Sequence, residues 1–516
     1  MKKLTAIALG ISAFFIQVPA ESTRPNIVLI MADDIGFSDI GCFGGEIDTP
    51  NLDRLGYGGV RFTQAYNMAK CNPTRSSMMT GTFWSGRNAA SLGGLMTQAG
   101  YTTLTSGKEH YDGWVPERCK AMNSFERSFT HYGGAGPFFD FNPVEFYLNE
   151  TKLKFDEIEH TTEPYYKTDV ITDYALRFLD ESKDGGKPFF LYLGYESAHF
   201  PLHTLKSDFE KYKGKYLKGW DAIRQERFDK QQKLGITEPN TKLSPPSGLE
   251  IGGNGGAYVS WDQIDEKDKD HLDTLMAAFA GMVHCLDRNI GRVIEKVEAM
   301  GQLDNTLFIF LSDNGSCPFG KDPRSPILDP THPESYLFLD CRWANVGNTP
   351  YRMFKQNGHA GGSRTHLLAY WPNVIKPGSI CREPAHLVDF MPTFLELAGG
   401  AYPSQIEGKP TPKLDGLSLV PLFKGETREP HKILISGWLE NKRMIRSGDW
   451  KLITGGGEKN EWGLYNMKDD PVELNDLSTQ MPEKVESMLK LYEEWKADRK
   501  VLGQLQKKGK SKGTAK

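Results

Sequence analysis

The chain has 516 residues, of which 39% are hydrophobic and 25% are charged, as in a globular protein that buries one or two large cores. Its formal net charge of −4 is small for this length, which argues against a nucleic-acid-binding protein. The seven cysteines do not have zinc-finger spacing.

The first 20 residues have the pattern of a secretory signal peptide. Lys2 and Lys3 are basic, Leu4 to Val18 is mostly apolar, and Ala20 is a small residue suited to cleavage. The apolar run falls short of the ~20 residues that span a bilayer, and we expect no membrane-spanning segment in the mature protein. Export would permit disulfides, but the sequence does not choose among their pairings.

Residues 24–421 predict one α/β domain, because short apolar runs typical of buried strands alternate with helical patterns. The predicted strands are Asn26–Ala32, Tyr101–Thr105, Pro188–Leu193, Thr306–Leu311 and Thr365–Trp371. The predicted helices include Asp169–Ser182, Asp268–Met300 and Val388–Ala398. Residues 205–265 are polar and break this alternation, and we interpret them as an insertion with a helix near Asp221–Leu234.

Residues 422–502 predict a smaller α+β domain with an antiparallel sheet. Its predicted elements are short strands at Ile433–Ser436, Arg443–Arg446 and Trp450–Ile453, followed by an amphipathic helix over Pro482–Asp498. The tail, residues 503–516, is rich in Lys, and we expect it to be disordered.

One segment places a cysteine and an arginine at the start of a short helix. It reads Lys70-Cys71-Asn72-Pro73-Thr74-Arg75, and Pro favours the first turn of a helix. Cys71 would then lie where free N–H groups and the macrodipole attract anions. Arg75 adds a fixed positive fork for oxyanions. A lone Cys near a Pro is more often only a small buried residue. Whether Cys71 has a catalytic role must therefore be judged from the other motifs of the chain.

Polar side chains follow several predicted strands, and one such group precedes a strand. They are Asp33 and Asp34, Lys108 and His110, His199, Asp313 and Asn314, and, before the last strand, Lys355. Because ligands bind beyond the carboxyl ends of strands in open α/β sheets, we expect these groups to share one pocket. The Asp and Asn oxygens suit Ca²⁺ or Mg²⁺, although either pair alone would also fit a turn after a strand.

The string Cys71-x-Pro73-x-Arg75, followed by Thr80-Gly81, resembles the signature of the type I sulfatases. Similarity to the bacterial arylsulfatase-like branch of this family extends over nearly the whole mature chain. It is most evident in residues 26–81, 214–235, 313–315, 358–372 and 464–477. The resemblance implies the alkaline-phosphatase-like fold, with helices on both faces of a large, mostly parallel sheet. The family usually has Glu where this chain has Ala360.

The family implies that a maturation enzyme oxidises Cys71 to formylglycine (3-oxoalanine), whose hydrate is the nucleophile. One Ca²⁺ would be held by Asp33, Asp34, Asp313, Asn314 and modified Cys71. Arg75 would stabilise the hydrate, Lys108 would bind the sulfate, and His110 would act as the base that releases it. His199 and Lys355 would lie on the leaving-group side, where one of them donates a proton. His203, four residues after His199, is a further candidate for substrate contact, with a structural role as the alternative.

The resemblance therefore implies a sulfatase exported to a bacterial periplasm or secreted, acting on sulfated carbohydrates, with aryl sulfates as surrogate substrates. One alternative is a formylglycine-dependent phosphonate monoester or phosphodiester hydrolase. A two-metal phosphatase is disfavoured, because Asn314 stands where a further His or Asp ligand is expected. The other alternative is a carbohydrate-binding relative that has lost catalysis; the intact set of reactive side chains argues against it.

Overall fold

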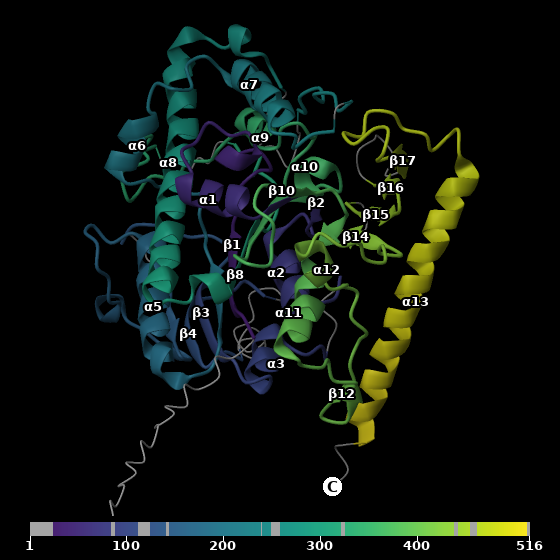
Figure 1. Cartoon of the computed structure of the whole chain (residues 1–516). Coiled ribbons are helices and arrows are strands. Elements are labelled where there is room, and N and C mark those ends of the chain that lie inside the picture. The colour runs from purple at the N-terminus through teal and green to yellow at the C-terminus, as the bar shows by residue number, and fades with distance from the viewer. Residues whose placement is uncertain are drawn as a thin grey trace, which may run out of the picture.

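The computed structural model describes residues 24–83, 88–111, 124–140, 144–238, 240–248, 258–320, 326–437, 442–454 and 462–512. The expected signal peptide, Cys119 and the last four residues lie outside these ranges. An eleven-stranded sheet runs through the centre of the described chain (Figure 1).

The large sheet has the strand order β10-β2-β9-β8-β1-β7-β3-β4-β5-β6, with β11 beside β2. Its strands are β1 (Asn26–Ala32), β2 (Val60–Tyr66), β3 (Thr102–Lys108), β4 (Arg127–His131), β5 (Tyr147–Leu148), β6 (Thr151–Lys152), β7 (Phe189–Gly194), β8 (Thr306–Ser312), β9 (Arg364–Tyr370), β10 (Ser379–Cys381) and β11 (Ala385–His386). The central strands β8, β1, β7, β3 and β4 are parallel, whereas β9 is antiparallel to both β8 and β2. The predicted mixed, mostly parallel α/β sheet is confirmed.

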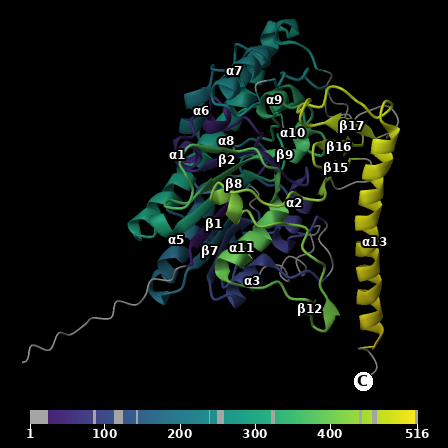
Figure 2. The ribbon, with the colours of Figure 1, turned by 45° about the vertical axis from the view of Figure 1, so that its right-hand side comes forward.

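The central strands are buried on both faces because their side chains alternate between two hydrophobic cores. In β1, Val28 and Ile30 enter one core, while Ile27 and Leu29 enter the other. The first core also holds α1 (Pro50–Gly58), α5 (Lys167–Ser182) and α8 (Glu266–Ala299). The second holds α2 (Cys71–Thr80), α3 (Leu92–Gln98), α11 (Phe390–Ala398) and α12 (Val420–Phe423) (Figure 2).

The segment predicted as an insertion contains α6 (Lys206–Tyr212) and α7 (Trp220–Lys233), and α7 lies against α9 (Cys341–Gly347). An ion network ties α7 to the N-terminal part of the chain: Arg227 and Asp39 are buried, and Glu46 lies at the surface. The Arg227 guanidinium lies 2.5 Å from an Asp39 carboxylate oxygen and 2.7 Å from one of Glu46. Burial makes these partners strongly dependent on one another.

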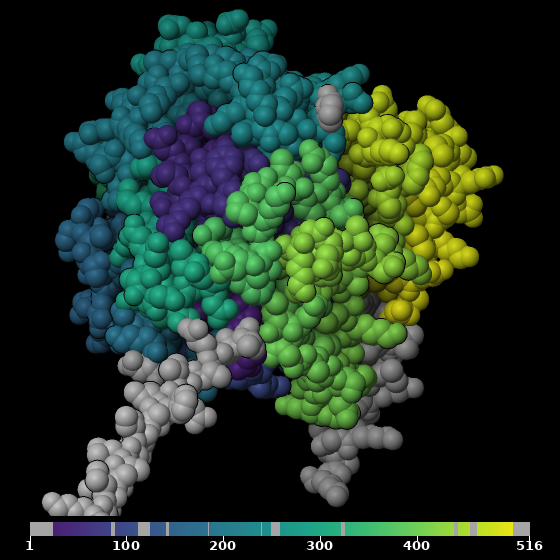
Figure 3. Space-filling model, viewed as in Figure 1, coloured from purple at the N-terminus to yellow at the C-terminus, as the bar shows by residue number. Residues whose placement is uncertain are grey.

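The C-terminal region contains a four-stranded antiparallel sheet and the helix α13, which form one side of the molecule (Figure 3). The sheet consists of β14 (Leu434–Ser436), β15 (Met444–Ser447), β16 (Trp450–Ile453) and β17 (Gly463–Asn466). Helix α13 spans Pro482–Lys512 and so extends beyond the predicted Pro482–Asp498 into residues 503–512 of the tail. The Lys, Gln and Leu residues of that stretch favour helix, and an existing helix propagates more easily than a new one forms. The remaining short elements are β12 (Gln405–Ile406), β13 (Lys409–Pro410) and α10 (Ala360–Ser363).

No helix in the described ranges is both long and apolar enough to cross a membrane. The six described cysteines, Cys42, Cys71, Cys285, Cys317, Cys341 and Cys381, form no disulfide with one another.

We predict that Arg227→Met lowers the free energy of unfolding by about 3–5 kcal/mol, because it leaves the buried Asp39 carboxylate without its cation. Urea unfolding followed by circular dichroism measures the change. Lys218→Met is the control: it removes the exposed Lys218–Glu226 pair and should cost less than about 1 kcal/mol. Equal losses of unfolding free energy in Arg227→Met and Lys218→Met would contradict a structural role for the Arg227 network.

Candidate active site

The carboxyl edge of the large sheet gathers the polar side chains predicted from the sequence. Ala32 of β1 is in register with Ser312 of β8, so Asp33 and Asp313 follow neighbouring strands at the same level. The Asp313 N–H donates to the Ala32 carbonyl (3.1 Å), which extends the pairing by one residue. Lys108 ends β3 and His199 follows β7. Because β9 is antiparallel to β8, β9 starts at this edge, and the segment before it, which carries Lys355, also lies here.

Helix α2 brings Cys71 and Arg75 to this edge. The helix begins at Cys71 and ends at Gly81, whose φ of 68° is left-handed and whose N–H donates to the Ser77 carbonyl. The Cys71 side chain is buried, and burial raises the pKa of its thiol. The unmodified thiol is therefore protonated at neutral pH and is a poor nucleophile.

All five N–H donors of Arg75 have acceptors within the protein. Its Nε donates to Asp313 (2.9 Å) and Nη2 faces Asp33 (3.5 Å). Its remaining donors reach the carbonyls of Lys108 (3.1 Å) and Tyr195 (3.2 Å) and the Tyr192 hydroxyl (3.3 Å). Arg75 thus fixes the two carboxylates instead of offering its donors to a ligand, and Tyr192 is a partner that the sequence analysis missed.

Two lysines and an amide bind the first pair of aspartates. The Lys108 ammonium pairs with Asp33 Oδ2, and Lys355 Nζ lies 2.6 Å from Asp34 Oδ1. Asn314 Nδ2 also donates to Asp34 Oδ1 (2.6 Å). Burial opposes the charge on Lys355, but Asp34 and the other acidic groups around it together outweigh burial, and the pKa of Lys355 rises well above its usual value. Both ammonium groups are therefore positive at neutral pH.

Four buried oxygens at this edge have no hydrogen-bond partner in the part of the chain that the structure describes: Asp33 Oδ1, Asp34 Oδ2, Asp313 Oδ1 and Asn314 Oδ1. Each belongs to a side chain whose other polar atom is held by the protein, as described above. Buried carboxylates normally have partners for both oxygens. An oxygen-only set of this kind fits one hard divalent cation such as Ca²⁺. Ligand atoms of Asp33, Asp34 and His199 lie within 4.8 Å of one another, which confirms how tightly the group is packed.

The two predicted site histidines are both neutral at physiological pH. Burial, with the charge of Lys108, lowers the pKa of His110 to about 2. Burial likewise lowers the pKa of His199. His199 Nδ1 lies 2.8 Å from the Phe200 carbonyl and must donate to it, so Nε2, 3.5 Å from Asp34, carries the lone pair.

His203 does not belong to this group, although it was a candidate for substrate contact. It is completely buried, its Nδ1 accepts from the Phe138 N–H (3.2 Å), and its Nε2 lies 2.7 Å from the Ser335 carbonyl. Both ring nitrogens are therefore used inside the protein. The four-residue spacing from His199 carried no information because the chain between them is not helical.

Gly315, which follows the predicted ligand Asn314, allows two loops to approach closely. A Cβ at Gly315 would lie 1.7 Å from the Gly361 carbonyl oxygen, a severe overlap. This contact joins the loop after β8 to the segment before β9 and so relates Asn314 to Lys355.

A buried glutamate from the C-terminal region, Glu473, anchors the segment that carries Lys355. Its carboxylate accepts from Lys451 (2.5 Å) of β16, from the Ala360 N–H (3.0 Å) and lies 2.7 Å from His359 Nδ1. Burial alone would raise the pKa of Glu473, but Lys451 and His359 hold it well below its usual range. The carboxylate binds the chain where the family usually has its own Glu and this protein has Ala360. No spacing in the sequence indicated this pairing.

A second buried glutamate supports the Lys108 side of the site. Glu196 lies 2.6 Å from Lys167 Nζ and 3.1 Å from His131 Nε2. Lys167 donates to the Gly136 carbonyl (2.9 Å) while Lys108 donates to that of Gly134, so both lysines fix the same loop. Glu196 stands three residues before His199 in the sequence, but nothing there predicts its distant partners.

Fold and site together are those of an α/β enzyme with a buried, oxygen-rich site that is suited to a divalent cation. The sulfatase family model matches residues 25–401 of the 516, and a model described as N-sulphoglucosamine sulphohydrolase, C-terminal, matches residues 352–500. The chain therefore belongs to the sulfatase family.

Relatives support this membership over nearly the full chain. An uncharacterized sulfatase of Schizosaccharomyces pombe is 31% identical over 94% of this chain and 95% of its own length. The N-acetylglucosamine-6-O-sulfatase of Bacteroides thetaiotaomicron is 27% identical over 95% of this chain and 89% of its own. One similar solved structure is that of a protein in complex with its substrate, D-glucosamine-2-N,6-O-disulfate. Its TM-score is 0.61 at 22% identity, and the match covers 93% of this chain and 98% of that chain, which shows the same fold.

We predict that Glu473→Ala lowers the free energy of unfolding by about 3–5 kcal/mol, since it leaves Lys451 buried and unpaired. It should also reduce kcat for an aryl sulfate by about 10- to 100-fold, because Lys355 loses its anchor. Thermal unfolding and steady-state kinetics measure the two effects.

Glu493→Ala, which removes the more exposed Glu493–Lys496 pair, is the control and should change neither quantity appreciably. Because the pKa of Glu473 is lowered in the folded protein, its contribution to stability is present above the ordinary Glu pKa of about 4.3 and is lost as the pH falls below it. Glu473→Gln should therefore flatten the acid side of the stability profile. Unchanged stability and kcat in Glu473→Ala would show that the anchor is dispensable.

Proposed function

We propose that this sulfatase hydrolyses sulfate monoesters of carbohydrates, using Cys71 after its conversion to formylglycine. The observation that supports this best is the convergence of three cationic side chains and four unpaired oxygens around the helix start that carries Cys71. A sulfate ester is an anion, so its cleavage needs fixed positive charge and a hard cation more than it needs a strong base.

The residues that would hold one Ca²⁺ are Asp33, Asp34, Asp313 and Asn314, together with modified residue 71. The ion would neutralise charge on the sulfate oxygens. Arg75 and Lys108 hold Asp33 in a fixed position, and Arg75 does the same for Asp313, so the oxygen set is arranged before a ligand arrives.

The hydrated aldehyde of formylglycine would supply one hydroxyl to attack sulfur as the S–O bond to the alcohol breaks, and a second hydroxyl whose deprotonation would expel sulfate and restore the aldehyde. The thiol of Cys71 offers no such second group, and its raised pKa leaves it protonated. A formylglycine-generating maturation enzyme is therefore a required partner of this chain.

The surrounding side chains hold the ester and move its protons. Lys108 and Lys355 bind sulfate oxygens through their ammonium groups, while Arg75 contributes its charge from behind Asp33 and Asp313. Neutral His110 accepts the proton when sulfate is released. Lys355, which contacts Asp34 and is positively charged, donates the proton to the departing alcohol. His199 also lies beside Asp34, but it is neutral and its single N–H is donated to the Phe200 carbonyl.

Two similar proteins support a sugar as the alcohol: an N-acetylglucosamine-6-O-sulfatase and a protein solved in complex with a disulfated glucosamine. The signal-peptide pattern of residues 1–20 supports export, to a periplasm or to the outside, where sulfated polysaccharides are met.

We predict that protein made with the maturation enzyme hydrolyses an aryl sulfate and that Cys71→Ala reduces this rate by at least about 1000-fold. Mass spectrometry of the tryptic peptide containing residue 71 should show the aldehyde in place of the thiol. Cys381→Ala, at a half-buried cysteine outside the site, is the matched control and should retain activity. A much faster rate on the matching aryl phosphate would instead favour a phosphoesterase.

We predict that Ca²⁺ stabilises chelator-treated protein, by about 2.7 kcal/mol at a free concentration 100 times its Kd. Asp313→Asn should abolish most of this shift, because it removes a negative oxygen from the set. Asp262→Asn, at an exposed aspartate of the same charge, should leave the shift intact. Thermal unfolding with and without Ca²⁺ measures the effect, and a response identical in both variants would place the ion elsewhere.

A further inference from the structure

Four aromatic rings form a cluster beside the proposed site, which we call the ring cluster: Phe200, Phe319, Tyr336 and Phe338. The Phe200 ring centroid lies 4.5 Å from that of Phe338, 5.7 Å from that of Phe319 and 6.3 Å from that of Tyr336. Tyr336 and Phe338 are 5.6 Å apart. These spacings are those of aromatic side chains in direct contact.

The ring cluster is only half-buried, and its members do not belong to the two large hydrophobic cores of the described chain. Four adjacent large apolar side chains that remain partly open to solvent are unusual on a protein surface, where such patches commonly mark binding sites. Packing of the main cores does not account for this cluster.

The backbone beneath the ring cluster is fixed. The Leu202 N–H donates to the Leu337 carbonyl (2.9 Å), and the Asp340 N–H donates to that of Phe319 (2.9 Å). Buried His203 bonds the Ser335 carbonyl on the same segment. The rings are therefore presented by segments that are tied to one another, which lowers the entropy lost when a ligand binds them.

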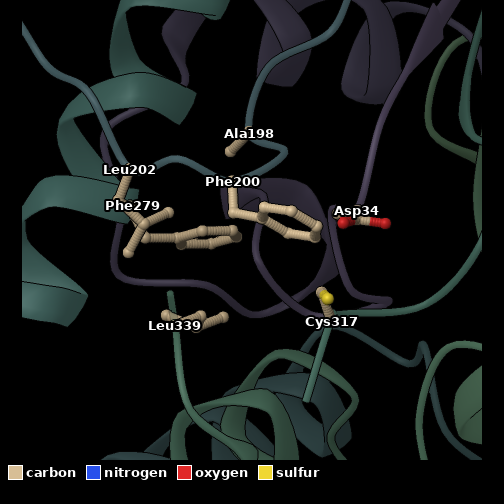
Figure 4. A pocket seen from close by; sticks show the side chains of 7 residues that line it. All are labelled: Asp34, Ala198, Phe200, Leu202, Phe279, Cys317 and Leu339. Atoms are coloured by element: carbon tan, nitrogen blue, oxygen red, sulfur yellow. The ribbon is translucent and has the colours of Figure 1, made fainter. Parts of the chain in front are cut away.

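The ring cluster is continuous with the reaction centre. The His199 ring contacts the Phe200 ring at an interplanar angle of 36°, with centroids 4.2 Å apart, and His199 Nε2 lies 3.5 Å from Asp34. Phe200 also lines a small cavity together with Asp34 and Cys317 (Figure 4). A sulfate held by Lys108 and Lys355 would thus have its alcohol portion next to aromatic rings.

We propose that the ring cluster is the subsite for the ring of the alcohol leaving group, which stacks on it through an apolar face. This inference rests on the proposed function and deepens it, because it assigns the part of the substrate that the cations do not bind. A pyranose presents C–H groups on one face and an aryl group presents its π-face, and both pack well against Phe and Tyr. An acyclic alkyl sulfate has the same charge but no such face.

Binding to protein in the Cys71→Ala background, which does not turn over, tests the proposal directly. Calorimetry would compare 4-nitrophenyl sulfate, glucosamine 6-sulfate and methyl sulfate. Adding Phe338→Ala should weaken binding of the ring-bearing esters by about 10-fold, while methyl sulfate changes less than twofold. Weaker binding of only one of the two ring-bearing esters would also support the subsite, and would show whether it binds an aryl ring or a sugar ring. Phe338→Leu, which keeps apolar volume but not the aromatic face, should give the same ranking and serves if Phe338→Ala does not fold.

Phe155→Ala is the matched control, since Phe155 is a more exposed ring that packs on Tyr165 outside the cluster. It should leave all three affinities unchanged. Equal loss for all three esters in Phe338→Ala, or no loss for any, would overturn the subsite even in an enzyme that hydrolyses sulfate esters. Failure of the proposed function would show separately, as no hydrolysis of any sulfate ester by formylglycine-bearing protein.

Discussion

The compensation of buried negative charge at one edge of the sheet governs this structure. Asp33, Asp34 and Asp313 are all fully buried, and carboxylates out of water are costly unless they are paired. The protein pairs one oxygen of each with Arg75, Lys108 or Lys355, whereas the other oxygen has no hydrogen-bond partner among the described residues. Parallel strands make this possible, because they deliver residues distant in the sequence to one level of the molecule.

The sequence predicted most of the central sheet because its strands are buried on both faces and read as continuous apolar runs. It predicted most of the site for a related reason: polar residues directly after such runs can only lie at the sheet edge. Strand β2 was missed because Arg61, Thr63 and Gln64 interrupt its apolar character. The tail helix was missed because a high Lys content is as typical of disorder as of an exposed helix.

Interactions between distant residues account for what the sequence could not predict. Glu473 and Lys355 are separated by the whole of β9 and the small C-terminal sheet, and no periodicity links them. His203 illustrates the reverse: its spacing from His199 suggested a shared role, but burial and two hydrogen bonds give it a structural one. The C-terminal region is therefore part of the support of the site, through Glu473, although none of the reactive groups comes from it.

The saturation of Arg75 by protein acceptors has a consequence for how the enzyme uses binding energy. A guanidinium with five occupied donors cannot turn toward an incoming ester without breaking its hydrogen bonds to groups at the sheet edge, so Arg75 holds helix α2 against this edge. The charged side chains around residue 71 therefore need little reorganisation when charge shifts during cleavage of the sulfate ester. Their electric field is already oriented to stabilise that charge. Rigidity here is a catalytic property, set when the chain folds.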